Sequence, residues 1–135
     1  MESYRVIDTT ERFGLYHLYE QVYLYDKQKQ YEIYLGAFYG DPSCGLISQD
    51  NTFCIIGGLD KWILYRYDKI TILDNWEILP AFDIRQISVS VVQILTDPWS
   101  EQSAIWSLEI NTLKDVKIKD FDQYLNKPYC ENIIW

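Results

Sequence analysis

Short runs of tyrosine, valine and isoleucine, separated by turn residues about every ten positions, are the feature that most constrains the fold of this chain. Apolar and polar side chains alternate within these runs, as they do along a half-buried β-strand. The alternation is clearest in residues 31–35, and further strands are expected at residues 5–8, 44–48, 53–57, 61–67, 70–73, 85–95 and 104–110. The pattern therefore predicts a mainly β fold.

Residues 12–25 are more ambiguous. Their apolar positions fit two strands with a kink between them, although a subset of these positions would also share one face of a helix: Leu15, Leu18, Tyr19 and Val22. We expect strands here, followed by a polar hairpin loop at residues 26–30.

Turn residues and a single helical pattern complete the outline. Residues 40–43 (GDPS) predict a turn, and residues 49–52 (QDNT) predict the loop of a hairpin. Residues 119–125 space apolar side chains at i, i+3 and i+4 behind an aspartate that can serve as N-cap. The sequence has no visible internal repeat. We therefore expect residues 1–135 to form a single domain, an antiparallel meander folded into a β-sandwich or a curled sheet, with one short C-terminal helix.

The cysteines and the N-terminus predict a cytoplasmic protein. Cys44, Cys54 and Cys130 are an odd number of thiols, which fits a reducing compartment. If residues 49–52 are a hairpin loop, Cys44 and Cys54 lie on opposite faces of its strands and cannot bridge. Residues 1–5 (MESYR) lack the basic, then apolar, pattern of a secretory signal, and no apolar run is long enough to cross a bilayer.

Charge excludes several classes of ligand. The chain has 20 acidic and 12 basic residues, and its formal net charge is −8. The nearest approach to a basic patch, Lys114, Lys117 and Lys119, is interrupted by Asp115. Nucleic acids and anionic membranes are bound by contiguous cationic surfaces, so neither is expected as a direct partner.

Residues that usually perform catalysis are scarce. His17 is the one histidine, so a catalytic triad would depend on it alone. The cysteine and histidine spacings match no zinc site, and Asp41, Asp50 and Asp60 match no calcium loop. We therefore expect no enzyme activity, no catalytic residues, no metal and no cofactor.

Aromatic residues are abundant instead, with 12 tyrosines and 5 tryptophans. Six rings are candidates for the core: Phe13, Phe38, Phe53, Trp62, Trp106 and Trp135. The tyrosines are too many to be buried together with partners for every hydroxyl, so some should be exposed. Aromatic rings beside acids suit the recognition of a cationic protein partner. The pattern predicts eight binding residues: Tyr25, Asp26, Asp60, Trp62, Tyr67, Asp68, Asp97 and Trp99.

Residues 38–48 (FYGDPSCGLIS), continuing through residues 50–58 (DNTFCIIGG), resemble a segment of small bacterial immunity proteins from polymorphic-toxin and contact-dependent growth inhibition systems. The resemblance implies that the chain neutralises one cognate toxin, often a basic nuclease, by covering its active site or an essential surface. It does not select the activity of the toxin, and the oligomeric state is left open.

Two other functions fit the same composition. Two carboxylates suffice for glycoside hydrolysis and aromatic rings stack on sugars, so a carbohydrate-binding or carbohydrate-active β-sandwich is an alternative. A protein-interaction domain of another kind is the third.

Overall fold

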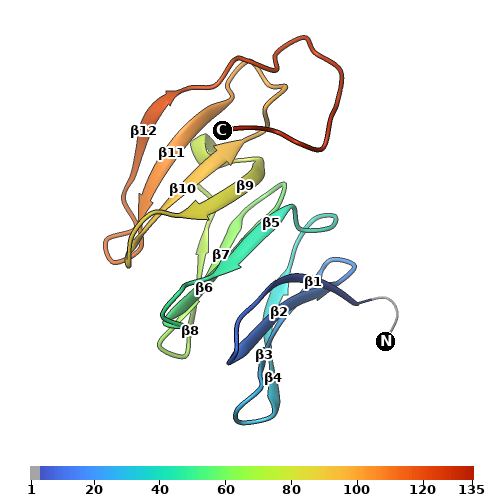
Figure 1. Cartoon of the computed structure of the whole chain (residues 1–135), viewed down its shortest axis with the longest axis vertical. Helices are drawn as coiled ribbons and strands as arrows, with labels where there is room; N and C mark the ends of the chain where they lie inside the picture. Colours follow the sequence, from blue (N-terminus) through green and yellow to red (C-terminus); the bar gives the residue numbers. More distant parts are fainter. Residues whose placement is uncertain (1–3) are drawn as a thin grey trace.

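The computed structural model describes residues 4–135 and consists of twelve strands in three four-stranded antiparallel sheets (Figure 1). Residues 1–3, on which part of the signal-peptide prediction rests, lie outside the described residues. Sheet A contains β1 (Tyr4–Thr9), β2 (Phe13–Leu18), β3 (Gln21–Asp26) and β4 (Tyr31–Ala37). Sheet B contains β5 (Cys44–Ile47), β6 (Phe53–Gly57), β7 (Trp62–Arg66) and β8 (Lys69–Leu73). Sheet C contains β9 (Ala81–Gln86), β10 (Val91–Thr96), β11 (Ala104–Glu109) and β12 (Asp115–Asp120), and a 3₁₀ turn, η1 (Trp76–Ile78), precedes it. The predicted mainly β fold is confirmed.

One unit occurs three times along the chain. In each sheet the strands follow one another in sequence order, and the second strands begin about forty residues apart, at Phe13, Phe53 and Val91. Four-stranded meanders stacked in this way also form the blades of β-propellers and other repeat proteins. The sequence does not reveal the repeat because strand pairing requires only alternating polarity, which many different residues satisfy.

Hairpin turns set the ends of the strands. Tyr67 and Asp68 have φ of 51° and 58° and form a two-residue turn between β7 and β8, where Arg66 pairs with Lys69. Turns of this kind have the same twist as the strands they join. At the end of β3, Asp26 Oδ1 accepts hydrogen bonds from the amides of Gln28 and Lys29, each 3.0 Å long.

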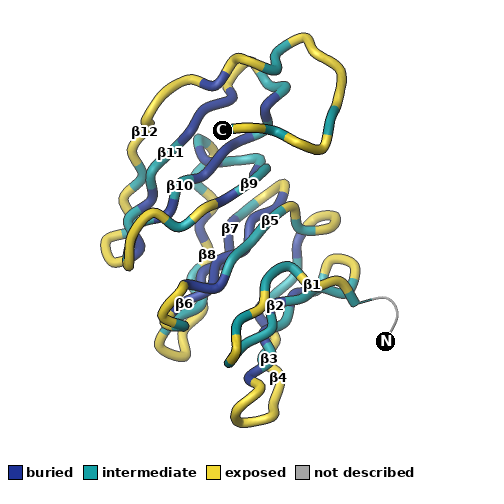
Figure 2. The backbone as a smooth tube through the Cα atoms, in the orientation of Figure 1, coloured by how far each residue is buried: buried dark blue, intermediate teal, exposed yellow. Residues whose placement is uncertain are grey.

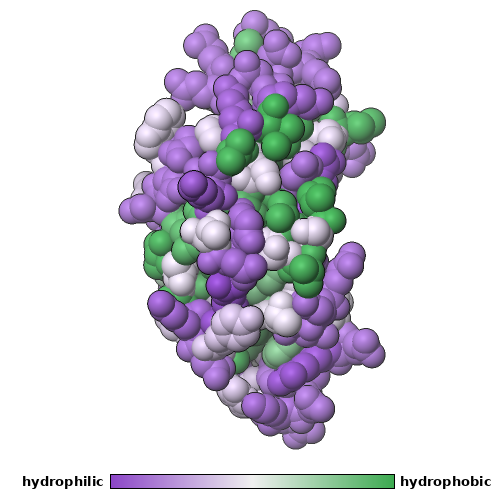
Figure 3. All heavy atoms as spheres, turned by 90° about the vertical axis from the view of Figure 1, so that its left-hand side faces the viewer, coloured by the Kyte–Doolittle hydropathy of each residue, from purple (hydrophilic) through white to green (hydrophobic). Residues whose placement is uncertain are grey.

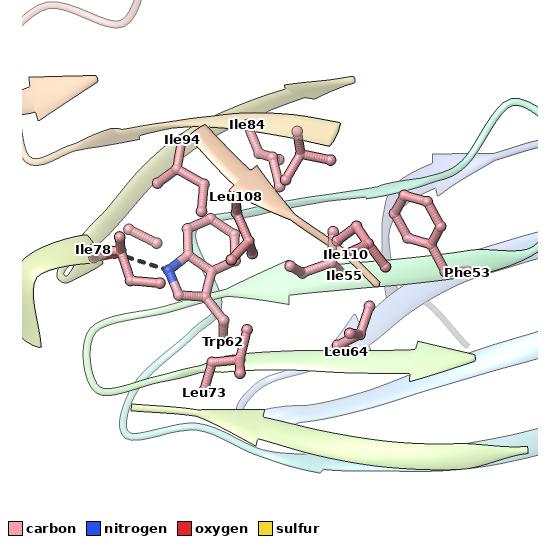
Figure 4. Packing of buried hydrophobic residues seen from close by; sticks show 12 residues of the cluster. Phe53, Ile55, Trp62, Leu64, Leu73, Ile78, Ile84, Ile94, Leu108 and Ile110 are labelled. Atoms are coloured by element: carbon pink, nitrogen blue, oxygen red, sulfur yellow. Dashed lines mark hydrogen bonds between the residues drawn. The ribbon is translucent and has the colours of Figure 1, made fainter. Parts of the chain in front are cut away.

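Sheet B is the centre of the molecule, with sheet A packed on one face and sheet C on the other (Figure 2). All five residues of β6 are buried. Trp62 is 0 % exposed, and its indole Nε1 donates a 2.8 Å hydrogen bond to the carbonyl of Ile78 (Figure 4). This bond ties η1 to the core between sheets B and C. Cys44 packs against that core and Cys54 against the core between sheets A and B, so the prediction that they lie on opposite faces is confirmed.

The two outermost faces of the stack differ. The outer face of sheet C packs against the C-terminal segment, residues 121–135, around buried Leu95, Ile105 and Phe121. The outer face of sheet A has no segment of the described chain packed over it and bears tyrosines.

Three predictions made from the sequence are wrong: two concern secondary structure, and one concerns the burial of aromatic rings. Residues 85–95 form parts of two strands, because Ile87 and Ser88 make a tight turn onto the carbonyl of Val91. Residues 119–125 are not helical: β12 continues to Asp120, and isolated turns follow it. Finally, three of the rings predicted for the core, Phe13, Trp106 and Trp135, are only half-buried.

Candidate binding cleft

The eight predicted binding residues lie in several parts of the molecule. Trp62 is at the centre of the core and cannot contact a partner, so this prediction is wrong; the ring is buried because β7 is the inner strand of the central sheet. Asp26 is also buried, and burial alone would raise the pKa of its carboxyl group. Hydrogen bonds from the Lys29 amide and Arg12 outweigh this effect and hold the pKa below its usual value. Asp26 therefore stabilises a turn.

Tyr67 and Asp68 lie with Asp26 at a groove between sheets A and B, with a volume of about 300 Å³. Tyr65 donates a 3.1 Å hydrogen bond to Asp68 at this groove. Three cations also line it, Arg12, Lys29 and Arg66. These three positive charges outnumber the two acids, so the groove does not favour a cationic ligand.

Asp60 and Tyr25 lie apart from that groove. Asp60 is in the loop between β6 and β7, where it accepts a 3.3 Å hydrogen bond from the Tyr39 amide and pairs with Lys61 at 3.2 Å. Tyr25 is on the outer face of sheet A, beside Tyr16 and Glu32.

Asp97 and Trp99 share the loop between β10 and β11, where the Asp97 carboxylate accepts a 3.0 Å hydrogen bond from the Trp99 amide. The Trp99 ring packs between Phe82 and Tyr129, with centroid distances of 5.6 and 5.0 Å. It therefore helps to hold the C-terminal segment. Asp97 itself lines a different and larger cavity.

That cavity, the acidic cleft, has a volume of about 520 Å³ and lies between η1, the β10–β11 loop and β11–β12. Its charged and aromatic lining residues are Trp76, Glu77, Asp97, Glu101, Trp106, Lys117 and Asp120. Four of these side chains are carboxylates and one is an ammonium group. Lys117 is paired with Asp120, so the remaining charge of the cleft is negative.

Hydrogen bonds hold the walls of the acidic cleft together. The Asp97 amide donates to the carbonyl of Pro80 at 3.2 Å, which ties the β10–β11 loop to the segment after η1. The Asn75 side-chain amide donates to Asp115 at 3.3 Å, which ties the start of η1 to β12. The cleft is therefore positioned by elements on both sides.

Two tryptophans give the acidic cleft its aromatic surface. The Trp76 ring is 75 % exposed, although η1 fixes its backbone. Trp106 is half-buried, and its indole Nε1 is covered and has no hydrogen-bond partner among residues 4–135. A ligand oxygen that reached this nitrogen would satisfy a donor that is otherwise costly to bury. An indole ring beside carboxylates is a favourable site for a cation.

The sequence alone did not select Trp76, Glu77, Glu101 or Asp120 as site residues. Trp76 lies in a short segment between strands, with acids at positions 74 and 77, which is the same aromatic–acid pattern used to choose Asp97 and Trp99. The apolar neighbours of Trp106 in the sequence predict a core position for this residue rather than a site.

His17 lies in β2 of sheet A, away from the acidic cleft, and its ring Nδ1 is 2.9 Å from the carbonyl oxygen of Tyr19. Within residues 4–135, three or more histidine, cysteine or acidic side chains do not come together as a metal site. The described part of the chain also contains no helix that is long and apolar enough to span a membrane.

Apolar side chains are also visible on the side of the molecule where β8 and β12 lie (Figure 3). These edge strands expose Ile70 and Ile72 in β8, and Val116 and Ile118 in β12. Isolated apolar residues of this kind are common on protein surfaces and do not define a site.

No family model, no curated protein and no solved structure matches this chain. Within residues 38–58, residues 44–47 and 53–57 form β5 and β6 in the central sheet. Their place in the core gives that segment a structural role.

Proposed function

We propose that this chain is a non-enzymatic binding protein that takes a positively charged segment of a partner protein into the acidic cleft. The observation that supports this function best is that an exposed indole ring and four carboxylates face one cavity of about 520 Å³. A site built by aromatic and charged groups on rigid elements is suited to recognition.

The chemistry of lysine and arginine matches this cleft. The aliphatic stem of either side chain can lie on the Trp76 ring while its cationic head reaches Glu77 or Glu101. The net charge of −8 also attracts a basic partner from a distance and speeds its association.

The role that fits these properties is that of a cytoplasmic immunity protein. A nuclease toxin must present positive charge to hold phosphates, and an acidic protein can occupy the same surface and exclude the substrate. The support for this role is the charge of the cleft together with the resemblance of residues 38–58.

A peptide titration tests the acidic cleft directly. An N-acetylated hexa-arginine peptide should change the tryptophan fluorescence of the protein, and raising NaCl from about 50 to 500 mM should weaken its binding because the charges are screened. The double variant Glu77→Gln/Glu101→Gln should bind more weakly, whereas Glu131→Gln, in the C-terminal segment, is the matched control. Binding that is indifferent to both salt and the double variant would contradict the proposal.

The immunity role has its own test. If the neighbouring gene encodes a secreted protein with a variable C-terminal domain, that domain should co-purify with this chain and lose its toxicity. The Glu77→Gln/Glu101→Gln variant should protect less well. Equal protection by this variant would separate the immunity role from the acidic cleft.

Carbohydrate binding is the second candidate, because exposed Trp76 lies near the polar side chains of Ser100 and Gln102 in the same cleft. A tryptophan ring beside hydrogen-bonding groups can stack on a sugar. Soluble oligosaccharides such as maltohexaose and xylohexaose would then change the tryptophan fluorescence. That response would not depend on salt, which distinguishes it from peptide binding.

A further inference from the structure

The outer face of sheet A bears five tyrosines and one valine, which together we call the tyrosine face: Tyr4, Val6, Tyr16, Tyr23, Tyr25 and Tyr34. Tyr16 and Tyr23 are stacked with their centroids 5.5 Å apart, and Tyr34 lies 5.5 Å beyond Tyr23. Val6 is 72 % exposed and Tyr34 is 51 % exposed. The face is therefore ordered by its own ring contacts and is open to solvent.

Two hydroxyl groups of the tyrosine face form hydrogen bonds within sheet A. Tyr16 donates to Glu32, and Tyr34 donates to Gln21 at 2.5 Å. Burial and the neighbouring Glu32 carboxylate raise the pKa of Tyr16, so its hydroxyl stays protonated. Because the hydroxyls of Tyr16 and Tyr34 are satisfied, these two side chains offer mainly their ring surfaces to a partner.

A shallow apolar depression lies within the tyrosine face, above Gly14, with a volume of about 420 Å³. A Cβ atom at Gly14 would meet only the Lys27 side chain, at 4.0 Å, so the space above the glycine is open. The charged residues that line the depression are Lys27 and Glu32, one of each sign. This balance contrasts with the net charge of −8 of the whole chain.

We propose that the tyrosine face binds the same face of a second copy of this chain, related by a two-fold axis. A basic partner gains little at a surface where opposite charges balance, whereas a second copy can place its Lys27 near Glu32 and is not repelled. The net charge of −8 opposes association of two copies, and it does so least where the contacting side chains carry balanced charges.

The other end of the stack determines the symmetry. In head-to-tail stacking, the outer face of sheet A would have to contact the outer face of sheet C in the next copy. Residues 121–135 already cover that face of sheet C, where Phe121 is only 2 % exposed. Association through the tyrosine face is therefore head-to-head and stops at two copies.

Surface area predicts a weak dimer. Four strands of six or seven residues form a face of roughly 20 by 20 Å, from about 3.3 Å per residue along a strand and 4.8 Å between strands. This is about 400 Å² per partner, below the ~800 Å² typical of stable complexes. The monomer and the dimer should therefore exchange at micromolar or higher concentrations.

Sedimentation velocity from about 1 μM to 1 mM protein tests the proposal. The wild-type chain should shift from monomer to dimer as its concentration rises, and the dissociation constant should change little with salt. The variant Val6→Lys/Tyr34→Lys places like charges opposite each other across the two-fold axis. It should dissociate at least tenfold more readily, with an unchanged circular dichroism spectrum.

A matched control is Tyr39→Lys, because Tyr39 is 73 % exposed but lies outside the tyrosine face. This variant should dimerise as the wild type does. A chain that stays monomeric at 1 mM, a dimer that the double variant does not weaken, or assemblies larger than two would each overturn the proposal. Hexa-arginine binding by Val6→Lys/Tyr34→Lys should be retained, so failure of the dimer is distinguishable from failure of the acidic cleft.

Discussion

The outer faces of sheets A and C both lie outside the sheet-on-sheet cores, but only the outer face of sheet C is covered by another part of residues 4–135. Each belongs to a four-stranded meander that has one side in a core. Sheet C covers its outer face with residues 121–135, which Trp135 anchors by a 2.8 Å hydrogen bond to Asp83. Sheet A leaves its outer face open and fills it with stacked tyrosines. An end sheet of a stack can therefore be closed by its own chain or left available for a partner.

The two ends also differ in charge. The acidic cleft, formed in part by sheet C, has a negative lining, whereas the lining of the depression on the tyrosine face is balanced. Association at the acidic cleft should depend strongly on salt, and association at the tyrosine face should not. This difference allows the two surfaces to be tested separately in one protein.

Removing the buried Phe121 ring from the covered outer face of sheet C should have the largest effect on stability. Phe121→Ala should lower the free energy of unfolding by about 3–5 kcal/mol, because it leaves a cavity among Leu95 and Ile105. Tyr34→Ala at the open end should cost about 1 kcal/mol or less, since half of that ring is exposed. Urea denaturation of the two variants measures the difference. Equal losses would contradict the contrast between the two ends.

Loosening the C-terminal segment should have the next largest effect. Trp135→Ala removes the hydrogen bond to Asp83 and the contact with the Arg85 guanidinium, which lies 4.0 Å from the ring centroid. We expect a loss of about 1–3 kcal/mol of stability. The exposed face of sheet C should then bind a fluorescent hydrophobic dye and permit head-to-tail stacking. If this variant forms dimers only, as the wild type is expected to do, the segment does not control assembly.

Trp76→Ala separates binding from folding. The ring is mostly exposed, so stability should change by about 0.5 kcal/mol or less. Hexa-arginine affinity should fall roughly five- to tenfold if a cation lies on this indole. Isothermal titration calorimetry, with Trp99→Phe as a variant of a tryptophan outside the lining of the cleft, measures the loss. An unchanged affinity would remove Trp76 from the site.

Alkaline pH should lower the stability of the folded chain by a small amount through Tyr16 on the tyrosine face. Because the pKa of Tyr16 is raised in the folded chain, the unfolded chain ionises first, from about pH 10. The stability that Tyr16 contributes is complete below that pH and is lost as the pH rises further. Tyr16→Phe should cost about 0.5–1.5 kcal/mol at neutral pH and should weaken the alkaline loss. Urea midpoints measured over a series of pH values give the stability at neutral pH and its loss at alkaline pH. The same alkaline loss in the wild type and in Tyr16→Phe would show that Tyr16 does not cause it.

Local patterns in the sequence were sufficient for most of the strands. Alternation predicted β4, β5 and β6, and it correctly placed Cys44 and Cys54 on opposite faces. It failed in residues 119–125, where an i, i+3, i+4 pattern also suits the end of a strand followed by turns. The outcome there depends on the packing of Phe121 against Leu95 and Ile105, which are distant from it in the sequence.

The candidate site was predictable only in part. The aromatic–acid pattern predicts Asp97 as a binding residue, and Asp97 lines the acidic cleft; Trp76 and Lys117, which line the same cleft, come from elements about twenty residues away on either side. Trp62 and Trp76 have similar acidic neighbours in the sequence, yet one is in a central strand and the other in an exposed turn. The strand order that separates them is a tertiary property.

Salt dependence of the two associations, measured on one sample, tests the central claim most directly. We predict that hexa-arginine binding weakens at least tenfold between about 50 and 500 mM NaCl, while the dimer dissociation constant changes less than about twofold. Two associations with the same salt dependence, or peptide binding that salt does not weaken, would contradict the account.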